Sequence, residues 1–288
     1  MVIPILFSVR KDHSLLTDPE SFGASPEDSF GVVAPDLPVY GSSDKPNKPG
    51  AIFRVHDRWA QLMTGVLGYK KFAAHGVDWG STVTEHLARS HPDSVIAIHL
   101  TDVPFGHLFR KPDDPSRQEK EFFEANDHWI QKEDAYAMIQ STKPQSLSCG
   151  LNDSPSGLAA WIVEKFRAWS DCGGDVESRF TKDELLTNVM IYWVTETIGS
   201  SFQPYYDFSN ATAFTWISEV IKGWVGSCKV PAALALFPKD ISRPPREWAQ
   251  RSFDVQRWTE MPRGGRFAAL EETELLADDS AWFRLFRS

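Results

Sequence analysis

Short apolar runs alternate with helical segments over the first third of the chain. Residues 30–35, 71–77 and 94–103 form compact apolar runs of the length that buried strands have. Between them, residues 52–68 and 81–90 carry apolar side chains at helical spacing. Strand, helix, strand, helix, strand in this order predicts a parallel sheet whose strands are joined by crossover helices.

The pattern then changes to long helices and returns to strands near the end. Helical spacing dominates after residue 109, and Thr181, followed by acidic residues, marks one helix start. Apolar runs at 230–237 and 253–259 predict two further strands, and 268–276 predicts a closing helix. The sheet pattern is therefore interrupted by a long helical block.

Such an interruption is typical of a sheet domain that carries an inserted lid. The predicted boundaries are 1–108 for the first part of the sheet domain, 109–225 for the helical lid and 226–288 for the second part. The apolar run at 2–7 is too short to cross a bilayer, so it is predicted to be a further buried strand rather than a transmembrane segment.

Composition adds few constraints. The net charge is −9, with 30 Lys plus Arg against 39 Asp plus Glu, and the charges are scattered. This balance gives no reason to expect nucleic acid or an anionic membrane as a partner. Cys149, Cys172 and Cys228 are odd in number and have no metal-binding spacing, so neither a disulfide framework nor a metal site is expected. A reducing, cytoplasmic location fits them best, and no cofactor is expected.

The strongest chemical signal is the sequence Gly-Val-Asp-Trp-Gly at 76–80, between a predicted strand and a predicted helix. A G-x-nucleophile-x-G turn in this position lifts the central side chain above the carboxyl edge of a sheet. Asp78 would then be a carboxylate nucleophile, and the backbone N–H of Trp79 could stabilise negative charge. The alternative from these five residues alone is a glycine-rich turn in which Asp78 only caps the helix.

Other segments resemble one family. The loop at 34–46, the segments at 150–160 and 237–240, and the sequence Glu-Met-Pro-Arg-Gly-Gly-Arg-Phe-Ala-Ala-Leu at 260–270 occur with the elbow in the order found in the microsomal-type branch of the epoxide hydrolases. The resemblance extends over nearly all of residues 15–286. It implies an α/β-hydrolase fold: a mostly parallel sheet with helices on both faces and an inserted helical lid.

The resemblance also implies roles for individual residues. Asp78 matches the nucleophile that forms an ester with the substrate, and Asp240 matches the acid that orients the catalytic histidine. Tyr136 and Tyr205 match two lid tyrosines that donate protons as the epoxide ring opens, with Tyr206 as a second choice for the latter. Phenol hydroxyls are suited to this task because an alkoxide is a poor leaving group. The implied substrate is a small apolar epoxide, converted to a diol.

Two features depart from the family pattern. Arg266 occupies the position of the catalytic histidine, and arginine cannot act as a general base because it stays protonated. His75, three residues before the nucleophile, is expected to pack into the sheet rather than replace that base. Residues 2–10 lack the family's His-Gly-x-Pro loop, so an oxyanion donor and early strands of the sheet are expected to be missing. Val39 also replaces a glycine in a tight loop, which predicts backbone strain.

Three functional interpretations follow. The first is an epoxide hydrolase that forms the Asp78 ester but hydrolyses it poorly. The second is a catalytically inactive relative that binds an apolar ligand or a partner chain, as the missing base and oxyanion donor suggest. The third is a haloalkane dehalogenase-like hydrolase, because that chemistry also begins with a carboxylate at the elbow and Trp79 lies beside it. The two tyrosines favour the epoxide, and a homo-oligomer remains an open alternative.

Overall fold

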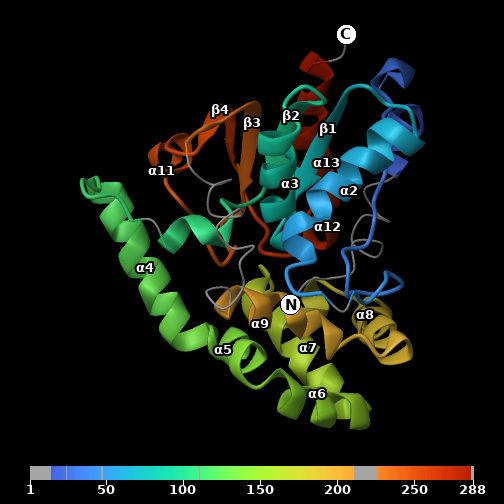
Figure 1. Cartoon of the computed structure of the whole chain (residues 1–288), viewed down its shortest axis with the longest axis vertical. Coiled ribbons are helices and arrows are strands. Elements are labelled where there is room, and N and C mark those ends of the chain that lie inside the picture. Colours follow the sequence, from blue (N-terminus) through green and yellow to red (C-terminus); the bar gives the residue numbers. More distant parts are fainter. Residues whose placement is uncertain (1–13, 24, 47, 110, 211–225, 287–288) are drawn as a thin grey trace.

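The computed structural model describes residues 14–23, 25–46, 48–109, 111–210 and 226–286. Its sheet has four strands in the order β1-β2-β3-β4, all parallel (Figure 1). The strands are β1 (Phe72–Gly76), β2 (Val95–Leu100), β3 (Cys228–Leu236) and β4 (Phe253–Glu260). Since the strands are parallel, their carboxyl ends meet along one edge of the sheet. Among the described residues no strand precedes β1, so the early strands that were expected to be missing are absent there.

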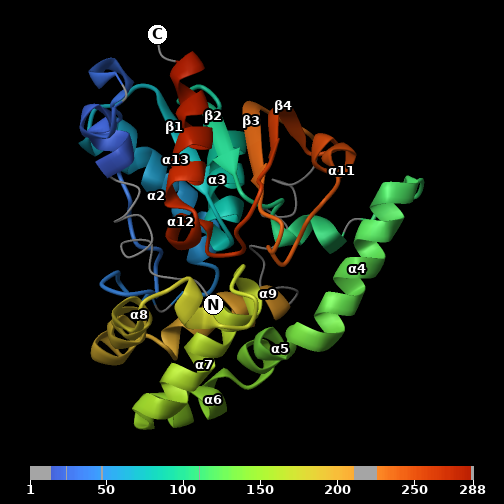
Figure 2. The ribbon, with the colours of Figure 1, turned by 180° about the vertical axis from the view of Figure 1, so that it is seen from behind.

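The helices belong to two groups. Those beside the sheet are α2 (Val55–Gln61), α3 (Trp79–Ser90), α11 (Arg246–Gln250), α12 (Ala268–Glu271) and α13 (Thr273–Ser280). Those between β2 and β3 in sequence are α4 (Arg117–Glu133), α5 (Ala135–Thr142), α6 (Pro144–Asp153), α7 (Pro155–Trp169), α8 (Lys182–Thr195) and α9 (Gln203–Ser209). The predicted α/β architecture is confirmed, with helices on both faces of the sheet (Figures 1 and 2).

Most predicted elements are present. The strands predicted at 71–77, 94–103, 230–237 and 253–259 correspond to β1 to β4, and the helix predicted at 81–90 to α3. The segment predicted as a helix at 52–68 consists of a 3₁₀ turn, α2 and a π-helical turn that ends at Val66. Thr181 caps α8, and its side chain and that of Glu184 bond reciprocally to each other's backbone N–H groups.

Two predicted elements need correction. Residues 30–35 form no strand, although the run is apolar. A strand needs a hydrogen-bonded neighbour, and among the described residues no strand pairs with this segment, which leaves Val33 39% exposed. The closing helix predicted at 268–276 is two helices, because Glu272 leaves the helical conformation at φ −138°. The strand predicted at 2–7 lies outside the described residues.

Two apolar clusters cover the faces of the sheet. On one face, Leu87 and Ala88 of α3 pack against Ile98 of β2 and Leu234 of β3. On the other, Trp282 follows α13 and packs against Ala97 and Ala233. The small alanines on this face allow the tryptophan ring to lie directly on the sheet. Burial on both sides explains why the strands read as continuous apolar runs.

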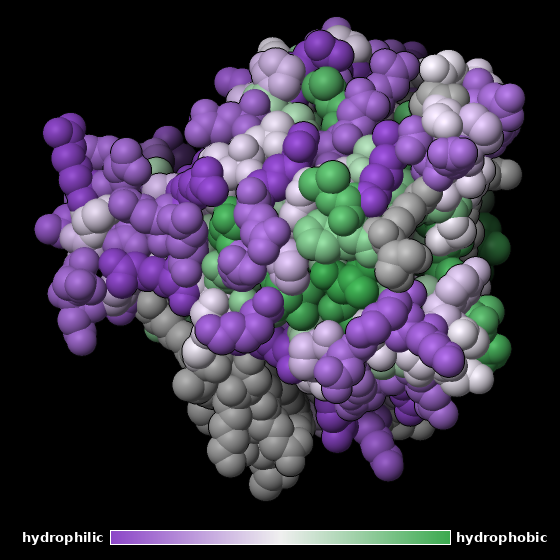
Figure 3. Space-filling view, turned by 90° about the horizontal axis from the view of Figure 1, so that it is seen from above, coloured by the Kyte–Doolittle hydropathy of each residue, from purple (hydrophilic) through white to green (hydrophobic). Residues whose placement is uncertain are grey.

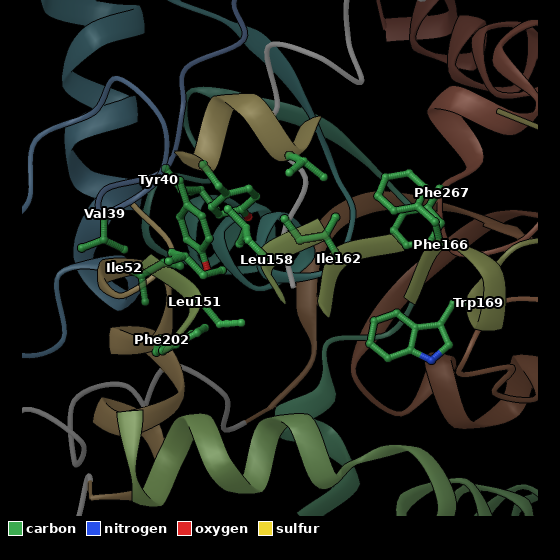
Figure 4. Packing of buried hydrophobic residues seen from close by; sticks show 14 of the residues in the cluster. Val39, Tyr40, Ile52, Leu151, Leu158, Ile162, Phe166, Trp169, Phe202 and Phe267 are labelled. Atoms are coloured by element: carbon green, nitrogen blue, oxygen red, sulfur yellow. The ribbon is translucent and has the colours of Figure 1, made fainter. Parts of the chain in front are cut away.

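A third cluster joins the block α5–α9 to the sheet domain (Figure 4). It combines apolar side chains from the loop before α2, from the helical block and from the loop after β4: Val39, Tyr40, Ile52, Leu151, Leu158, Ile162, Phe166, Trp169, Phe202 and Phe267. Phe166 of α7 stacks on Phe267, with ring centroids 4.3 Å apart. The helical block is therefore packed onto the segment that carries Arg266.

The face shown in Figure 3 is mainly hydrophilic, with a central group of apolar side chains surrounded by polar ones. Within the described ranges, no helix is long and apolar enough to cross a membrane. Cys149, Cys172 and Cys228 are all free thiols.

The close packing of the elbow predicts that a side chain at Gly76 would destabilise the fold. A Cβ atom there would lie 2.2 Å from the carbonyl oxygen of Gly80 and 2.5 Å from Thr84 Oγ1. We therefore expect Gly76→Ala to lower the free energy of unfolding by about 1–3 kcal/mol in urea denaturation. Gly80→Ala is the matched control, because its Cβ would meet nothing within 4 Å and alanine favours the helix. Equal stability of the two variants would contradict the close packing of the elbow.

Candidate active site

Asp78 lies at the turn between β1 and α3. Its backbone has φ 54° and ψ −125°, a combination that is costly for a residue with a side chain. The close approach of Gly76 to Gly80 makes this turn sharp enough to raise Asp78 at the carboxyl edge of the sheet. The carboxylate Oδ1 accepts a hydrogen bond from the backbone N–H of Trp79 at 2.7 Å. The start of α3 thus stabilises the negative charge of Asp78.

Arg266 reaches Asp78 from the loop after β4. Its backbone N–H donates to the carbonyl of Trp169 at 2.9 Å, which fastens the loop to the end of α7. Gly265 is needed there because a Cβ atom would lie 2.5 Å from that same carbonyl oxygen. Phe267 on the other side is held by its stacking on Phe166. These contacts direct the guanidinium group of Arg266 toward the elbow.

Three carboxylates surround this guanidinium group. Nη2 lies 2.9 Å from Asp78 Oδ2, and Nη1 lies 2.9 Å from Asp102 Oδ2 and 3.2 Å from Asp240 Oδ1. The Arg266 side chain is 8% exposed, and those of Asp102 and Asp240 are 6% and 2% exposed. The structure thus brings together Asp78, Asp240 and Arg266, which the sequence singled out, and adds Asp102.

The sequence analysis missed Asp102. This residue follows β2 directly, at the same edge of the sheet as the elbow. Its Oδ1 accepts a short hydrogen bond from Ser81 Oγ, and Ser81 lies on the first turn of α3. A polar residue after a buried strand of a parallel sheet is a recognisable signal, because ligand sites gather at the carboxyl ends of such strands. That signal was present in the sequence Leu-Thr-Asp at 100–102.

The charges in this cluster shift the pKa values of its members. Burial alone would raise the pKa of Asp78, but the charge of Arg266 and the Trp79 N–H outweigh it, so the pKa lies below its usual value. The pKa of Asp240 is raised to about 6, mainly by burial and also by Asp102, against the opposing effect of Arg266. Burial opposes the charge of Arg266 but the three carboxylates hold its pKa well above the usual value. Arg266 therefore remains a cation.

Tyr136 of α5 and Tyr205 of α9 meet above the elbow. Their ring centroids are 5.9 Å apart, and the ring of Tyr205 lies 5.5 Å from that of Trp79. Burial raises the pKa of both phenols above the usual value, and the negative charge of Asp78 raises each further. Both hydroxyl groups therefore stay protonated. Tyr206, the second choice, is 40% exposed.

His75 is placed away from this cluster of charges. Its Nδ1 lies 2.9 Å from Nδ1 of His99 on β2, and His99 Nε2 lies 2.9 Å from Asp279 Oδ2 on α13. These contacts join the ring of His75 to the neighbouring strand, but the residue is exposed and not packed into the sheet as expected.

Val39 has the strain that the sequence predicts. Its φ is 73°, a value that is unfavourable for a β-branched side chain. Two contacts hold this loop against the segment before α9. Ser200 Oγ donates to the carbonyl of Val39 at 2.7 Å, and the Tyr40 hydroxyl donates to the carbonyl of Ser201 at 3.2 Å. The strained loop thus helps to position α9, which carries Tyr205.

Comparison with known proteins agrees with this architecture. A family model described as the alpha/beta hydrolase fold matches residues 18–160. The silkworm Bombyx mori juvenile hormone epoxide hydrolase superposes with a TM-score of 0.81 at 26% identity, over 98% of this chain and 70% of that structure. The chain has the α/β-hydrolase fold. The Aspergillus niger epoxide hydrolase structure gives a TM-score of 0.76 at 26% identity, with 96% of this chain and 69% of that structure covered.

The homologues of the chain are epoxide hydrolases. Epoxide hydrolase 1 of Sus scrofa is 34% identical over 290 residues, which cover 92% of this chain and 62% of that protein. Juvenile hormone epoxide hydrolase 2 of Ctenocephalides felis is 32% identical over 300 residues, with coverages of 96% and 60%. The chain thus spans less than two thirds of the length of these curated relatives.

The contacts of Arg266 with three carboxylates predict that its loss would destabilise the fold. Arg266→Met leaves three buried carboxylates without their cation, so we expect a loss of about 3–5 kcal/mol in the free energy of unfolding at pH 8. In the variant, the uncompensated carboxylates have raised pKa values. Falling pH therefore protonates them and removes the unfavourable free energy of burying their charges. In the native chain Asp78 has a pKa below its usual value and stays ionised at both pH 8 and pH 5, so its stabilising effect does not change between them. Protonation of the carboxylates in the variant therefore makes the difference smaller at pH 5.

Urea denaturation at the two pH values measures this difference. Arg263→Met is the control, because Arg263 lies in the same loop but is 57% exposed, and its partner Glu272 also pairs with Arg179. A loss of at most about 1 kcal/mol is expected for this control. A loss for Arg266→Met that did not depend on pH would contradict a role in charge compensation.

Proposed function

We propose that the chain opens small apolar epoxides through an ester on Asp78, with a slow hydrolytic half-reaction. The observation that carries this proposal is the position of two half-buried, protonated phenols, Tyr136 and Tyr205, above a carboxylate on a strained elbow. The epoxide hydrolase homologues support the same chemistry. In this proposal the helical block α4–α9 acts as a lid over the elbow.

Ring opening would proceed by displacement at carbon. An oxygen of the Asp78 carboxylate attacks one carbon of the epoxide, and the bond between that carbon and the ring oxygen breaks. The electron pair passes to the ring oxygen, which takes a proton from Tyr136 or Tyr205. An alkoxide is a stronger base than even a phenolate of raised pKa, so the transfer is favourable once the ring has opened. The product is a hydroxyalkyl ester of Asp78.

Arg266 would affect the two half-reactions differently. In the first, its ion pair with Asp78 keeps the carboxylate ionised, although it also lowers the nucleophilicity of the oxygen that it contacts. In the second, a guanidinium group that stays charged cannot remove a proton from water, whereas the histidine of the homologous position can. The ester is therefore expected to form and then to persist.

A non-catalytic relative is the second candidate function. The same ion pair favours it, because a carboxylate bonded to Arg266 and to the N–H of Trp79 is a weakened nucleophile. In that case the chain would bind an apolar ligand without reaction. A haloalkane dehalogenase-like hydrolase has less support, because two phenols suit a developing alkoxide better than a departing halide ion.

Incubation with styrene oxide followed by intact-mass spectrometry tests the proposal. We expect the native protein to gain the mass of one epoxide, on the tryptic peptide that contains Asp78. Asp78→Asn should gain nothing, because an amide lacks the nucleophilic carboxylate. Asp279→Asn, a change of the same kind at a buried carboxylate on α13, should be labelled normally. A native protein that is thermally stabilised by the epoxide but never labelled would favour the non-catalytic relative.

The choice between neighbouring tyrosines gives a separate prediction. Tyr205→Phe removes a hydroxyl above the elbow and should slow labelling of Asp78 by about 10²-fold or more. Tyr206→Phe, at the adjacent and exposed position, should leave the labelling rate within about twofold of native. Time courses of adduct formation measure both rates. If the two variants were slowed equally, Tyr205 would not be the proton donor.

A further inference from the structure

Two polar atoms in the charge cluster have no hydrogen-bond partner among the described residues. They are Oδ2 of Asp240 and Nε of Arg266, and both atoms are buried. The other polar atoms of these two side chains are occupied: Asp240 Oδ1 contacts Arg266 Nη1 and accepts from the N–H of Ile241, and both terminal nitrogens of Arg266 contact carboxylates. A buried polar atom without a partner is costly, so such atoms mark places where a ligand or reactant is bound.

Their positions relative to Asp78 are informative. Asp240 and Asp78 contact the same guanidinium group, one at Nη1 and the other at Nη2. The two carboxyl groups are thus held within a few ångströms of each other, a separation that one water molecule can bridge. The Nε–H of arginine lies on the same edge of the planar group as Nη2, the nitrogen that contacts Asp78. The unpartnered donor therefore lies on the side of the guanidinium group that contacts Asp78, and the unpartnered acceptor belongs to a carboxylate bound to the same group.

We infer that Asp240 is the general base of the hydrolytic half-reaction in this chain and that Arg266 is its oxyanion donor. This inference rests on the proposed Asp78 ester. Asp240 would then have a different task from the one that the family resemblance implies, which is to orient a histidine. Arg266 would supply the second hydrogen-bond donor that the sequence otherwise lacks.

The step balances without any further group. Asp240 Oδ2 takes a proton from a water molecule, whose oxygen attacks the carbonyl carbon of the Asp78 ester. The negative charge of the tetrahedral intermediate is stabilised by the backbone N–H of Trp79 and by Arg266. The bond between that carbon and the alkoxy oxygen breaks, and the oxygen takes the proton back from Asp240. The products are the diol and an Asp78 carboxylic acid that contains one oxygen atom from water. The proton of this acid passes to the tyrosinate left by ring opening, which restores the Asp78 carboxylate and the tyrosine.

The electrostatics of Asp240 suit this role. A useful general base has a pKa near the working pH, and the pKa of Asp240 is raised to about 6 by burial and by Asp102. The charged groups that face it are Arg266, Asp102 and, across the guanidinium, Asp78. Esterification of Asp78 removes one negative charge from this group. The pKa of Asp240 in the ester form should therefore lie below its value in the free protein.

Decay of the Asp78 adduct tests the inference. The native protein is labelled with styrene oxide, excess epoxide is removed, and loss of the adduct is followed by intact mass between pH 5 and 9. Decay should rise with pH and reach a plateau at a pH below about 6, because the pKa of Asp240 in the ester form lies below its value in the free protein. Asp240→Asn should decay about 10²-fold more slowly at pH 7 and lose the plateau, leaving only a rise with hydroxide concentration. In H₂¹⁸O, native decay should place ¹⁸O in the Asp78 peptide.

Asp102→Asn shows whether slower decay of the adduct comes from loss of the base or only from loss of a negative charge beside Arg266. This variant removes a similar negative charge beside Arg266, but both oxygens of Asp102 already have partners, Ser81 and Arg266. Its adduct should decay less than about tenfold more slowly than native and should keep the plateau. Arg266→His is the positive control, because an imidazole at this position supplies a base and should accelerate decay.

The outcomes distinguish this inference from the proposed function. An adduct that decays at the native rate in Asp240→Asn, or that is slowed equally in Asp102→Asn, would overturn the role of Asp240 while leaving the ester in place. Absence of any adduct on the native protein would overturn the ester, and the inference with it.

Discussion

The site depends on one cation among three carboxylates. Asp78, Asp102 and Asp240 come from the ends of three different strands, and each would repel the others in a buried environment. Removing an ion from water costs several kcal/mol, so this arrangement is stable only if the charges are compensated. The guanidinium group of Arg266 provides that compensation because it has enough donors to contact all three carboxylates at once. The position of Arg266 is in turn fixed by Trp169 and Phe166 at the end of α7.

The helical block is therefore coupled to the charge cluster by packing and not only by proximity. The helical block places Tyr136 and Tyr205 over the elbow through α5 and α9. Through α7 the same block holds the backbone of Arg266 and the ring of Phe267. Displacement of α7 would shift the cation away from the nucleophile. The strained turns at Val39 and Asp78 are held in the same way, because the hydrogen bond from Ser200 and the start of α3 oppose their relaxation.

The sequence was sufficient for most of the fold, because buried parallel strands and their crossover helices have distinct apolar patterns. The prediction of a strand at 30–35 was wrong, because no described strand pairs with this apolar run. Strand pairing depends on the tertiary structure, and a local sequence pattern does not contain that information. The elbow at Asp78 was predictable since its glycines are required by contact distances. Asp102 was not found, because its importance comes from its distance to Arg266, a residue 164 positions away in sequence. The unpartnered atoms of Asp240 and Arg266 are likewise visible only in three dimensions.

The family resemblance places Arg266 at a histidine position, and the three carboxylates offer a physical explanation for that difference. A neutral imidazole among three buried carboxylates would leave them uncompensated, whereas a protonated imidazole could not act as a base. Arginine removes this conflict by staying charged at every accessible pH, which stabilises the folded site and sacrifices the strongest available base. The remaining acceptor with a pKa near neutrality is then a carboxylate, and Asp240 is the member of the cluster whose second oxygen is still without a partner. In the proposed mechanism, charge compensation thus determines both which base is lost and which group can replace it.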